Sequence, residues 1–540
     1  MRLAHWLASP AAALPAGLAQ ALSIADPWTG QPHWWLQIAS LAWLVWQFAH
    51  HAERQLSWRA STWVSPETGG AWRGGFAAGG LFGLGWLAGT FWWLFISMHT
   101  YGGLAAPLAV AAVLALAGLL ALYYALAAAA FMALAPARLL ARRPVLCASG
   151  FAALWTLAEL LRGTLFTGFP WGAGGYAHVD GPLAFLARYA GVYGIGFVAA
   201  ALAALLALAP RVAWHRPRVW AMSALLLLLG AGLWGWRWCE LDGACRAPQA
   251  PLRTEVALLQ GNIAQDEKFV PGTGVADSLR WYGEQLQGAA APLVVAPETA
   301  LPLLPRQLPD GYWQALTERF AGPGQAALLG VPLGNLEEGY TNSVVGFAPG
   351  QAAPYRYDKH HLVPFGEFIP PLFRWFVRLM NIPLGDFARG GLGQPAFAWQ
   401  GQRLAPNICY EDLFGEELGA RFADPASAPT AFVNLSNIAW FGDTVAIDQH
   451  LAISRMRALE FERPMLRATN TGATAIIDHR GQVTHQLPRL TRAVLAGSFE
   501  GRTHLTPYAR WVALAGLWPL WAGCALLAAA LASAARRARG

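Results

Sequence analysis

The chain has few charged residues and almost no lysine. Only 13% of its 540 residues are charged, 55% are hydrophobic, and the mean hydropathy is +0.34. A chain this apolar does not form one soluble globular domain. Of its 38 basic residues only Lys268 and Lys359 are lysines. Either codon bias left these two by chance, or they occupy sites that need a compact ammonium rather than a planar guanidinium.

Cysteine is also scarce, with five residues, and none of them has the spacing of a zinc or redox motif. Cys147 and Cys524 fall in apolar stretches, where packing explains them. Cys239 and Cys245 flank a polar turn after an apolar stretch, and a loop of this length allows a disulfide on an oxidising side of a membrane. The free form of these two is equally compatible with the sequence. We expect no metal site and no cofactor.

Long apolar stretches are what the chain does have. They fill residues 1–245 and recur in 508–540, whereas 250–505 has the composition of an ordinary globular domain. We therefore expect a multi-pass α-helical membrane protein with about eight spans, seven of them before the globular domain and one after it. The expected spans are 4–24, 33–50, 74–97, 105–135, 145–162, 183–209, 219–238 and 510–532.

The formal net charge of +7 reflects arginines in short loops and at the chain ends rather than a basic stripe that would bind nucleic acid. With eight spans both termini lie on one side of the membrane, and the loop arginines fall on that same side. By the positive-inside rule, both termini are cytoplasmic and 250–505 lies outside, which is the periplasm for a bacterial inner membrane. The arginines are Arg2, Arg54, Arg59, Arg73, Arg138, Arg142, Arg143, Arg211, Arg216, Arg218, Arg536, Arg537 and Arg539.

A carboxylate and a guanidinium lie three residues apart at the outer end of the fifth expected span. Glu159 and Arg162 are costly there unless they face the bundle interior or a polar cavity. The loop that follows contains Trp171 and Tyr176 and is rich in glycine. It is either an aromatic belt at the membrane interface or the lining of an access path for lipid chains.

Strand-like and helix-like segments alternate through 250–505, which predicts an α/β domain with sheets covered by helices. The expected strands are 254–263, 292–297, 326–333, 341–347, 403–409, 430–435, 473–477 and 493–499. The expected helices are 273–288, 308–320, 370–380, 413–422 and 444–462.

Three polar residues stand at or near the ends of apolar runs in this domain: Glu298, Lys359 and Cys409. A thiol on a strand-to-helix turn lies near backbone N–H groups that favour the thiolate, although a lone cysteine is more often simply buried. The set contains a carboxylate to take a thiol proton, an ammonium to stabilise negative charge and a sulfur to carry an acyl group. Together they point to nucleophilic catalysis.

In this order and context the three residues resemble the catalytic triad of the nitrilase superfamily. With spans on both sides of the domain, the chain resembles the apolipoprotein N-acyltransferase family over nearly its whole length. The motifs that carry the resemblance are Thr167-Gly-Phe-Pro-Trp171, Gln260-Gly-Asn-Ile263, Pro297-Glu298, His361-Leu-Val-Pro-Phe-Gly-Glu367, Ile408-Cys-Tyr-Glu411, Trp440-Phe-Gly442, Met456-Arg-Ala-Leu-Glu460 and Leu505-Thr-Pro-Tyr508.

The resemblance implies a nitrilase-like α-β-β-α sandwich in which Glu298 is the general base, Lys359 stabilises the oxyanion and Cys409 is the nucleophile. It also implies an acyl chain taken from a membrane phospholipid onto the cysteine and passed to the α-amine of a diacylglyceryl-cysteine apolipoprotein. A monomer is expected. Glu367, Tyr410 and Glu411 match supporting positions of the active site. The candidate substrate-binding residues are Phe269, Trp440, Phe441, Trp171 and Tyr176.

Two positions depart from the family pattern: Ile438 replaces an aspartate, and Phe269 replaces a tryptophan. Two other functions remain open on the sequence. A membrane-tethered amidase of the same superfamily would use the same triad without needing the spans. A transporter with an outer solute-binding domain would use the Glu159 and Arg162 pair, but no run of charges traces a path through the spans.

Overall fold

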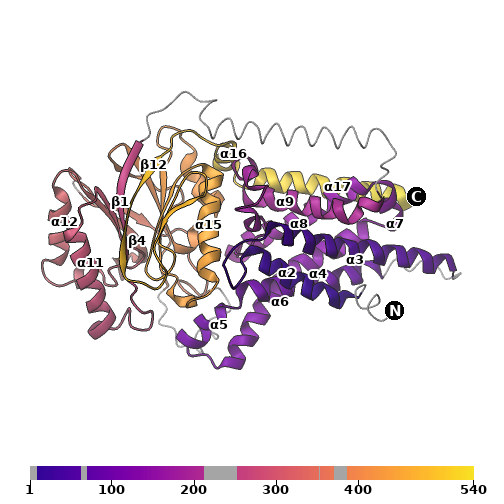
Figure 1. Ribbon diagram of the computed structural model, residues 1–540, viewed down its shortest axis with the longest axis horizontal. Helices are drawn as coiled ribbons and strands as arrows, with labels where there is room; N and C mark the ends of the chain where they lie inside the picture. The colour runs from indigo at the N-terminus through magenta and orange to yellow at the C-terminus, as the bar shows by residue number, and fades with distance from the viewer. Residues whose placement is uncertain (1–8, 62–69, 212–251, 352, 370–385, 540) are drawn as a thin grey trace.

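The computed structural model describes most of the chain, and it contains an α/β domain beside a long helical bundle (Figure 1). The expected span 219–238, the expected helix 370–380 and the Cys239 and Cys245 pair lie outside the described residues. The described ranges are 9–61, 70–211, 252–351, 353–369 and 386–539.

The helical bundle combines the first part of the chain with its last helix. In the described part of the chain, four helices are long and apolar enough to cross a membrane, and a bent pair makes a fifth candidate. The bundle helices are α2 (Ala13–Ile24), α3 (Trp34–Ser61), α4 (Ala71–Phe91), α5 (Leu94–Ile96), α6 (Ala106–Leu134), α7 (Ala137–Arg142), α8 (Pro144–Thr164), α9 (Ala187–Leu208) and α17 (Trp518–Arg539).

The span expected at 74–97 is bent rather than straight. Helix α4 ends at Phe91, and the segment from Leu94 to Tyr101 turns away by 61°. The turned segment meets the α/β domain, where the Tyr101 ring contacts the Trp440 ring edge to face at 5.8 Å. The bend therefore directs the end of this helical segment toward the α/β domain, where it makes a contact that a straight helix would not make.

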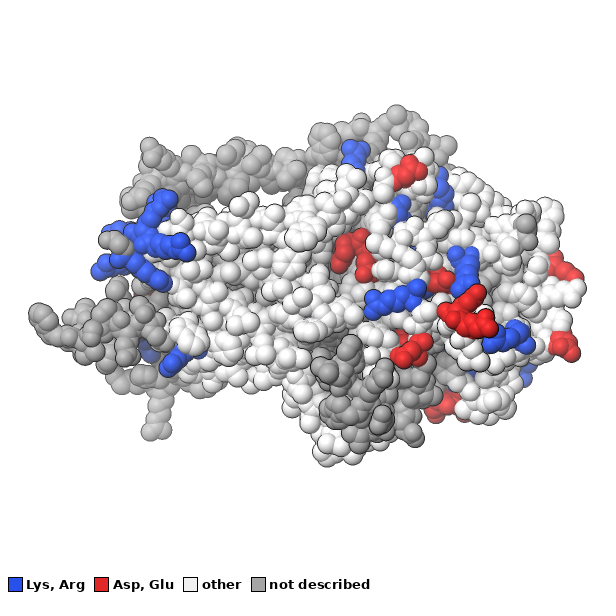
Figure 2. Space-filling view, turned by 180° about the vertical axis from the view of Figure 1, so that it is seen from behind, with Lys and Arg blue, Asp and Glu red and all other residues white. Residues whose placement is uncertain are grey.

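Charge is distributed unevenly on the bundle surface. Figure 2 shows a broad uncharged band and a group of basic side chains at the end far from the α/β domain. Helix α17 ends there with Arg536, Arg537 and Arg539, and the described chain also ends there. An uncharged band with basic residues at one end is the pattern of a protein in a bilayer.

The α/β domain contains two six-stranded sheets, ordered β12-β1-β2-β3-β4-β5 and β11-β10-β9-β8-β7-β6. In each sheet three neighbouring inner strands pair in parallel, β1 with β2 and β2 with β3 in the first, β7 with β8 and β8 with β9 in the second. The strands are β1 (Leu252–Gln260), β2 (Leu293–Val295), β3 (Ala326–Asn335), β4 (Gly339–Phe347), β5 (Tyr355–Asp358), β6 (Phe397–Trp399), β7 (Gln402–Ile408), β8 (Ala431–Ser436), β9 (Met465–Thr469), β10 (Ala475–Ile477), β11 (Val483–Gln486) and β12 (Ala493–Gly501).

All eight expected strands are present, and four more were not predicted. Strands β5, β6 and β11 are three or four residues long and lie at sheet edges, where polar residues such as His485 interrupt an apolar pattern. Strand β9 is fully buried but carries Arg467, whose charge conceals the strand in the sequence.

The two sheets pack face to face through aliphatic side chains such as Leu258, Leu328, Ile408 and Val433. Helices α11 (Ala276–Gly288) and α12 (Tyr312–Ala321) cover the first sheet, and α15 (Ala446–Phe461) covers the second. This is an α-β-β-α sandwich, the nitrilase-like α/β fold that the sequence predicts.

One expected helix of this domain, 413–422, is wrong as a continuous element. It is three short turns instead: η9 (Cys409–Leu413), α14 (Gly415–Gly419) and η10 (Ala420–Phe422). The break falls at Phe414, whose φ of −104° and ψ of 79° are not helical. The next residue, Gly415, lies so close to Arg457 that a Cβ there would be 2.2 Å from the guanidinium, so packing on α15 decides the break.

Helix α15 lies between the sheets and the bundle in Figure 1, so one outer layer of the sandwich faces the membrane part. Gln449 on α15 joins the two. Its Oε1 accepts hydrogen bonds from the indole N–H groups of Trp93 at 3.1 Å and Trp171 at 2.7 Å. The loop that contains Cys409 comes from the strand layer directly behind α15, and this places it next to the bundle.

Candidate active site

Cys409 stands directly after β7, in a strained backbone conformation. Its φ is +52°, a left-handed value that non-glycine residues adopt rarely and that is enriched at functional sites. The Asn434 amide donates to the Cys409 carbonyl at 3.2 Å, and His450 Nε2 lies at the same distance from it. These contacts hold the sharp turn that separates the thiol from the strand.

Glu298 follows β2 in a comparable turn, where Thr299 has a φ of +46°. Its carboxylate is buried and held from two sides. Oε1 accepts from Asn342 Nδ2 at 2.7 Å, and Oε2 accepts from the Asn437 backbone N–H at 2.8 Å. The carboxylate therefore has a single orientation.

Lys359 follows β5, and its side chain is 1% exposed. Its Nζ lies 3.5 Å from Glu298 Oε1 and 2.9 Å from Glu367 Oε2. Burial by itself lowers the pKa of Lys359, but the carboxylates of Glu367 and Glu298 outweigh it and raise the pKa above its usual value. The group is an ammonium at neutral pH, placed between two carboxylates.

The surroundings favour the charged form of Lys359 but the neutral form of the Cys409 thiol. Burial, with the negative charge of Glu298 adding to it, raises the pKa of Cys409 to about 12, although Lys359 acts in the other direction. The resting sulfur is therefore protonated at neutral pH. Nucleophilic attack requires a base that takes the proton during the reaction.

Glu411 serves the loops rather than the thiol. Its carboxylate accepts from the backbone N–H groups of Ile408 and His360, both at 2.6 Å, and from the Tyr357 hydroxyl at 2.8 Å. Because His360 follows Lys359 and Ile408 precedes Cys409, this one carboxylate ties the lysine loop to the cysteine turn. Its neighbour Tyr410 donates its hydroxyl to the Gly168 carbonyl at 3.1 Å and so contacts the bundle.

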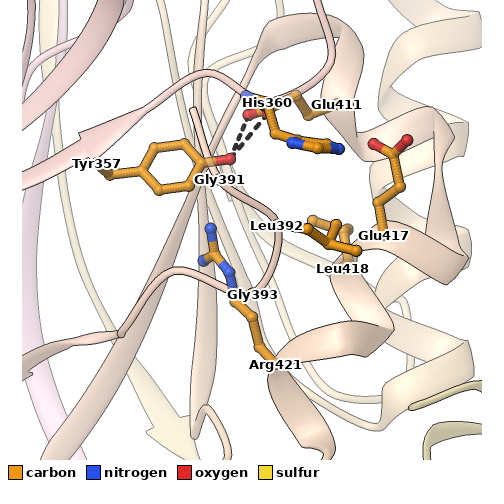
Figure 3. A pocket seen from close by; sticks show the side chains of 9 residues that line it. All are labelled: Tyr357, His360, Gly391, Leu392, Gly393, Glu411, Glu417, Leu418 and Arg421. Carbon is orange, nitrogen blue, oxygen red and sulfur yellow. Dashed lines mark hydrogen bonds between the residues drawn. The ribbon is translucent and has the colours of Figure 1, made fainter. Parts of the chain in front are cut away.

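Behind this junction lies a small pocket, shown in Figure 3. The Tyr357 hydroxyl points to Glu411, while the side chains of Glu417 and Arg421 lie on other sides of the same hollow. Glu298, Lys359 and Cys409 do not line it, so it is separate from these three residues.

The expected substrate-binding residues divide into partly accessible and buried ones. Phe269 is 51% exposed, and Trp440 and Phe441 are partly exposed. The Phe441 ring packs on Trp93 of the bundle with ring centroids 4.3 Å apart. Trp171 and Tyr176 are buried.

Glu159 and Arg162 are buried in the bundle, which is one of the two placements that the sequence left open, and they hold the loop that carries Trp171. Arg162 Nη1 donates to the carbonyls of Phe169 at 2.6 Å and Trp171 at 2.8 Å. Glu159 accepts from the Gly174 N–H at 3.0 Å. In this structure the pair therefore positions a loop.

Several residues at the site were not predicted. Asn342 and Asn437 orient Glu298, and Lys268 donates to the Glu298 backbone carbonyl at 3.1 Å. The lysine count singled out Lys268 without giving it a place. A buried amide within the apolar run of β4 was the available signal for Asn342.

Both parts of the chain match models of known protein families. Residues 16–205 match the model of the apolipoprotein N-acyltransferase N-terminal domain, and 255–508 match the carbon-nitrogen hydrolase model. The apolipoprotein N-acyltransferase of Verminephrobacter eiseniae is 61% identical over 94% of this chain and 92% of its own length. Those of Ralstonia nicotianae and Bordetella bronchiseptica are 46% and 42% identical, over 92% and 98% of this chain and 89% and 97% of their own lengths. This chain belongs to the apolipoprotein N-acyltransferase family.

Proposed function

We propose that the chain carries out the N-acylation of apolipoproteins through a thioester on Cys409, with a membrane phospholipid as the acyl donor. The observation that carries this mechanism is the buried cluster in which the Lys359 ammonium lies 3.5 Å from Glu298 and both groups act electrostatically on the Cys409 sulfur. Such a cluster supplies a base, a cation and a nucleophile within one water-poor site.

In the first half-reaction, the Cys409 sulfur attacks the carbonyl carbon of a phospholipid ester while Glu298 takes the thiol proton. The new S–C bond places negative charge on the carbonyl oxygen, which Lys359 stabilises. The C–O bond then breaks, and the leaving glycerol oxygen takes the proton back from Glu298. The products are a lysophospholipid and an acyl-enzyme.

In the second half-reaction, the neutral α-amine of the diacylglyceryl-cysteine attacks the thioester carbon. Glu298 accepts a proton from the attacking nitrogen as the N–C bond forms. The C–S bond breaks, and the proton returns to the sulfur. One active site serves two bulky lipids in turn, so the kinetics are ping-pong.

The acyl-enzyme must be kept from water between the two steps. We assign this shielding, and contacts to the lipid chains, to Phe269, Trp440 and Phe441, since these aromatic rings are partly exposed. Trp171 and Tyr176 would support the same surface from the bundle side. Glu367 keeps Lys359 in place, and Glu411 and Tyr410 keep the cysteine turn in place.

The membrane arrangement follows the same logic. We propose about eight spans, with a transmembrane part at 1–245, a catalytic domain at 250–505 and a last span with a short tail at 508–540. Both termini would be cytoplasmic and the catalytic domain periplasmic, on the inner membrane, because the basic residues gather at the bundle end opposite that domain. We expect a monomer.

The test is to incubate purified full-length protein with a phospholipid of defined chains and a synthetic diacylglyceryl-cysteine peptide. The expected result is an acyl adduct on Cys409 with phospholipid alone, and N-acylated peptide after the peptide is added. The Cys409→Ala variant should give neither while remaining folded. Release of free fatty acid without peptide acylation would favour a hydrolase instead, and an acyl adduct on no residue would refute the covalent route.

A further inference from the structure

Lys268 is buried beside the triad. It lies in the turn after β1, its side chain is 1% exposed, and its Nζ donates to the Glu298 backbone carbonyl at 3.1 Å. The chain covers it closely, since a Cβ at Gly274 would lie 2.8 Å from the Lys268 Cα. The only two lysines of the chain therefore converge on one residue, Lys359 on the carboxylate of Glu298 and Lys268 on its backbone.

The peptide that Lys268 binds is also confined from the other side. A Cβ at Gly330 would lie 2.7 Å from the Glu298 Cα, so this glycine lets β3 pass directly against the turn. The next residue, Thr299, has the left-handed φ of +46°. A strained turn persists only when its surroundings hold it, and the Lys268 ammonium holds the backbone of this one through the Glu298 carbonyl.

Charge adds to the geometric role. Burial lowers the pKa of Lys268 to about 8, although Glu298 and Cys409 act to raise it. The ammonium therefore acts on the same two groups that exchange a proton in the first half-reaction, and it is lost at a moderately alkaline pH. An arginine at this position would bring a larger, planar group that a 1% exposed site does not accommodate.

We propose that Lys268 is a positioning residue for acyl transfer: its ammonium holds the Glu298 turn so that the carboxylate meets the Cys409 proton. This inference rests on the proposed role of Glu298 as the base. The alternative is a buried lysine that merely satisfies a carbonyl and contributes to folding alone. The two differ in what happens to the rate of Cys409 acylation when the protein remains folded.

The experiment compares the full-length wild type with Lys268→Met, which removes the donor and the charge, and Lys268→Gln, which keeps a neutral donor. Arg306→Met is the matched control, because Arg306 is an exposed cation that also donates to a backbone carbonyl, that of Gly334 at 3.1 Å. Mass spectrometry of the Cys409 peptide follows single-turnover acylation by a defined phospholipid as pH and lipid concentration vary. Rates are divided by the folded fraction of each preparation.

We expect Lys268→Met to lower the acylation rate by about 100-fold with an unchanged dependence on lipid concentration, the size of effect that misplacing a catalytic group produces. Lys268→Gln should recover part of this rate. The wild-type rate should fall as the pH rises through about 8, where the ammonium is lost, and neither variant should show this fall.

Three results would overturn the proposal: a folded Lys268→Met variant as fast as Arg306→Met, a wild-type rate that does not fall through that pH range, or the same fall in both variants. The wild-type profile needs no variant to fold. A wild type that forms no adduct on Cys409 would refute the proposed function itself, whereas adduct formation with an unaffected Lys268→Met would refute this inference alone.

Discussion

Asn342 Nδ2 lies 2.7 Å from Glu298 Oε1 and 2.7 Å from Glu367 Oε1. One amide group therefore joins the two carboxylates that flank the Lys359 ammonium. The repulsion between two neighbouring carboxylates is offset when a cation and hydrogen-bond donors lie between them. Asn342 and Lys359 together provide both.

Replacing Asn342 with leucine should remove the shared donor at nearly constant volume. We expect Asn342→Leu to slow Cys409 acylation by about 100-fold, because the Glu298 carboxylate loses one of its fixed contacts. Single-turnover acylation followed by mass spectrometry measures this. Asn335→Ala is the control, since Asn335 caps an exposed turn next to the same strand pair. Equal rates in the two variants would contradict the role assigned to Asn342.

Lys359→Arg should be severely impaired even though it preserves the charge. The site is 1% exposed and holds Nζ between Glu298 and Glu367, so a guanidinium displaces one of them. Loss of a placed oxyanion stabiliser costs about 100- to 1,000-fold in rate. The acyl adduct on Cys409 and peptide N-acylation should fall together. Activity close to the wild type would mean that charge alone suffices at this position.

The stability of the protein should depend on pH in alkaline solution because of Lys268. Burial lowers the pKa of this lysine from 10.5 to about 8 in the folded state, so between these two pH values Lys268 is protonated in the unfolded chain and neutral in the folded one. The contribution of Lys268 to the free energy of unfolding therefore increases as the pH rises across that window. This gain disappears as the pH falls back through about 8. Thermal unfolding in detergent should show the wild type gaining stability relative to Lys268→Met from pH 8 to 10.5. Arg306→Met should follow the wild type throughout, and parallel curves for wild type and Lys268→Met would contradict the lowered pKa.

The junction between the two parts of the molecule should depend on Gln449. In Gln449→Leu the indole N–H groups of Trp93 and Trp171 lose their acceptor in a buried place. Each unsatisfied buried group costs about 1–3 kcal/mol, so we expect a clear drop in the melting temperature. Gln314→Leu, at an exposed position on α12, should leave the melting temperature nearly unchanged. A similar effect of both substitutions would show that the junction does not rely on this contact.

Much of the fold was predictable because the order of apolar and polar residues along the chain indicates where helices and strands form. Long apolar stretches indicated the bundle, and alternating apolar runs indicated the eight strands that were expected. The pattern failed where tertiary contacts override it. Strand β9 was missed because the charged Arg467 interrupts its apolar run. The helix expected at 413–422 breaks because Gly415 packs on Arg457.

Glu298, Lys359 and Cys409 were singled out because a carboxylate, one of only two lysines and a thiol at or near the ends of apolar runs form an unusual set, and because their order and context resemble the nitrilase superfamily. The sequence by itself thus indicated the groups proposed for catalysis and that they belong to a domain beside membrane helices. Only the tertiary structure decided that Asn342, Asn437 and Lys268 converge on Glu298, and that Glu411 ties loops together instead of facing the thiol. The physical reason is that these contacts join residues from different strands and turns, and the distances between them depend on how two sheets pack and not on spacing along the chain.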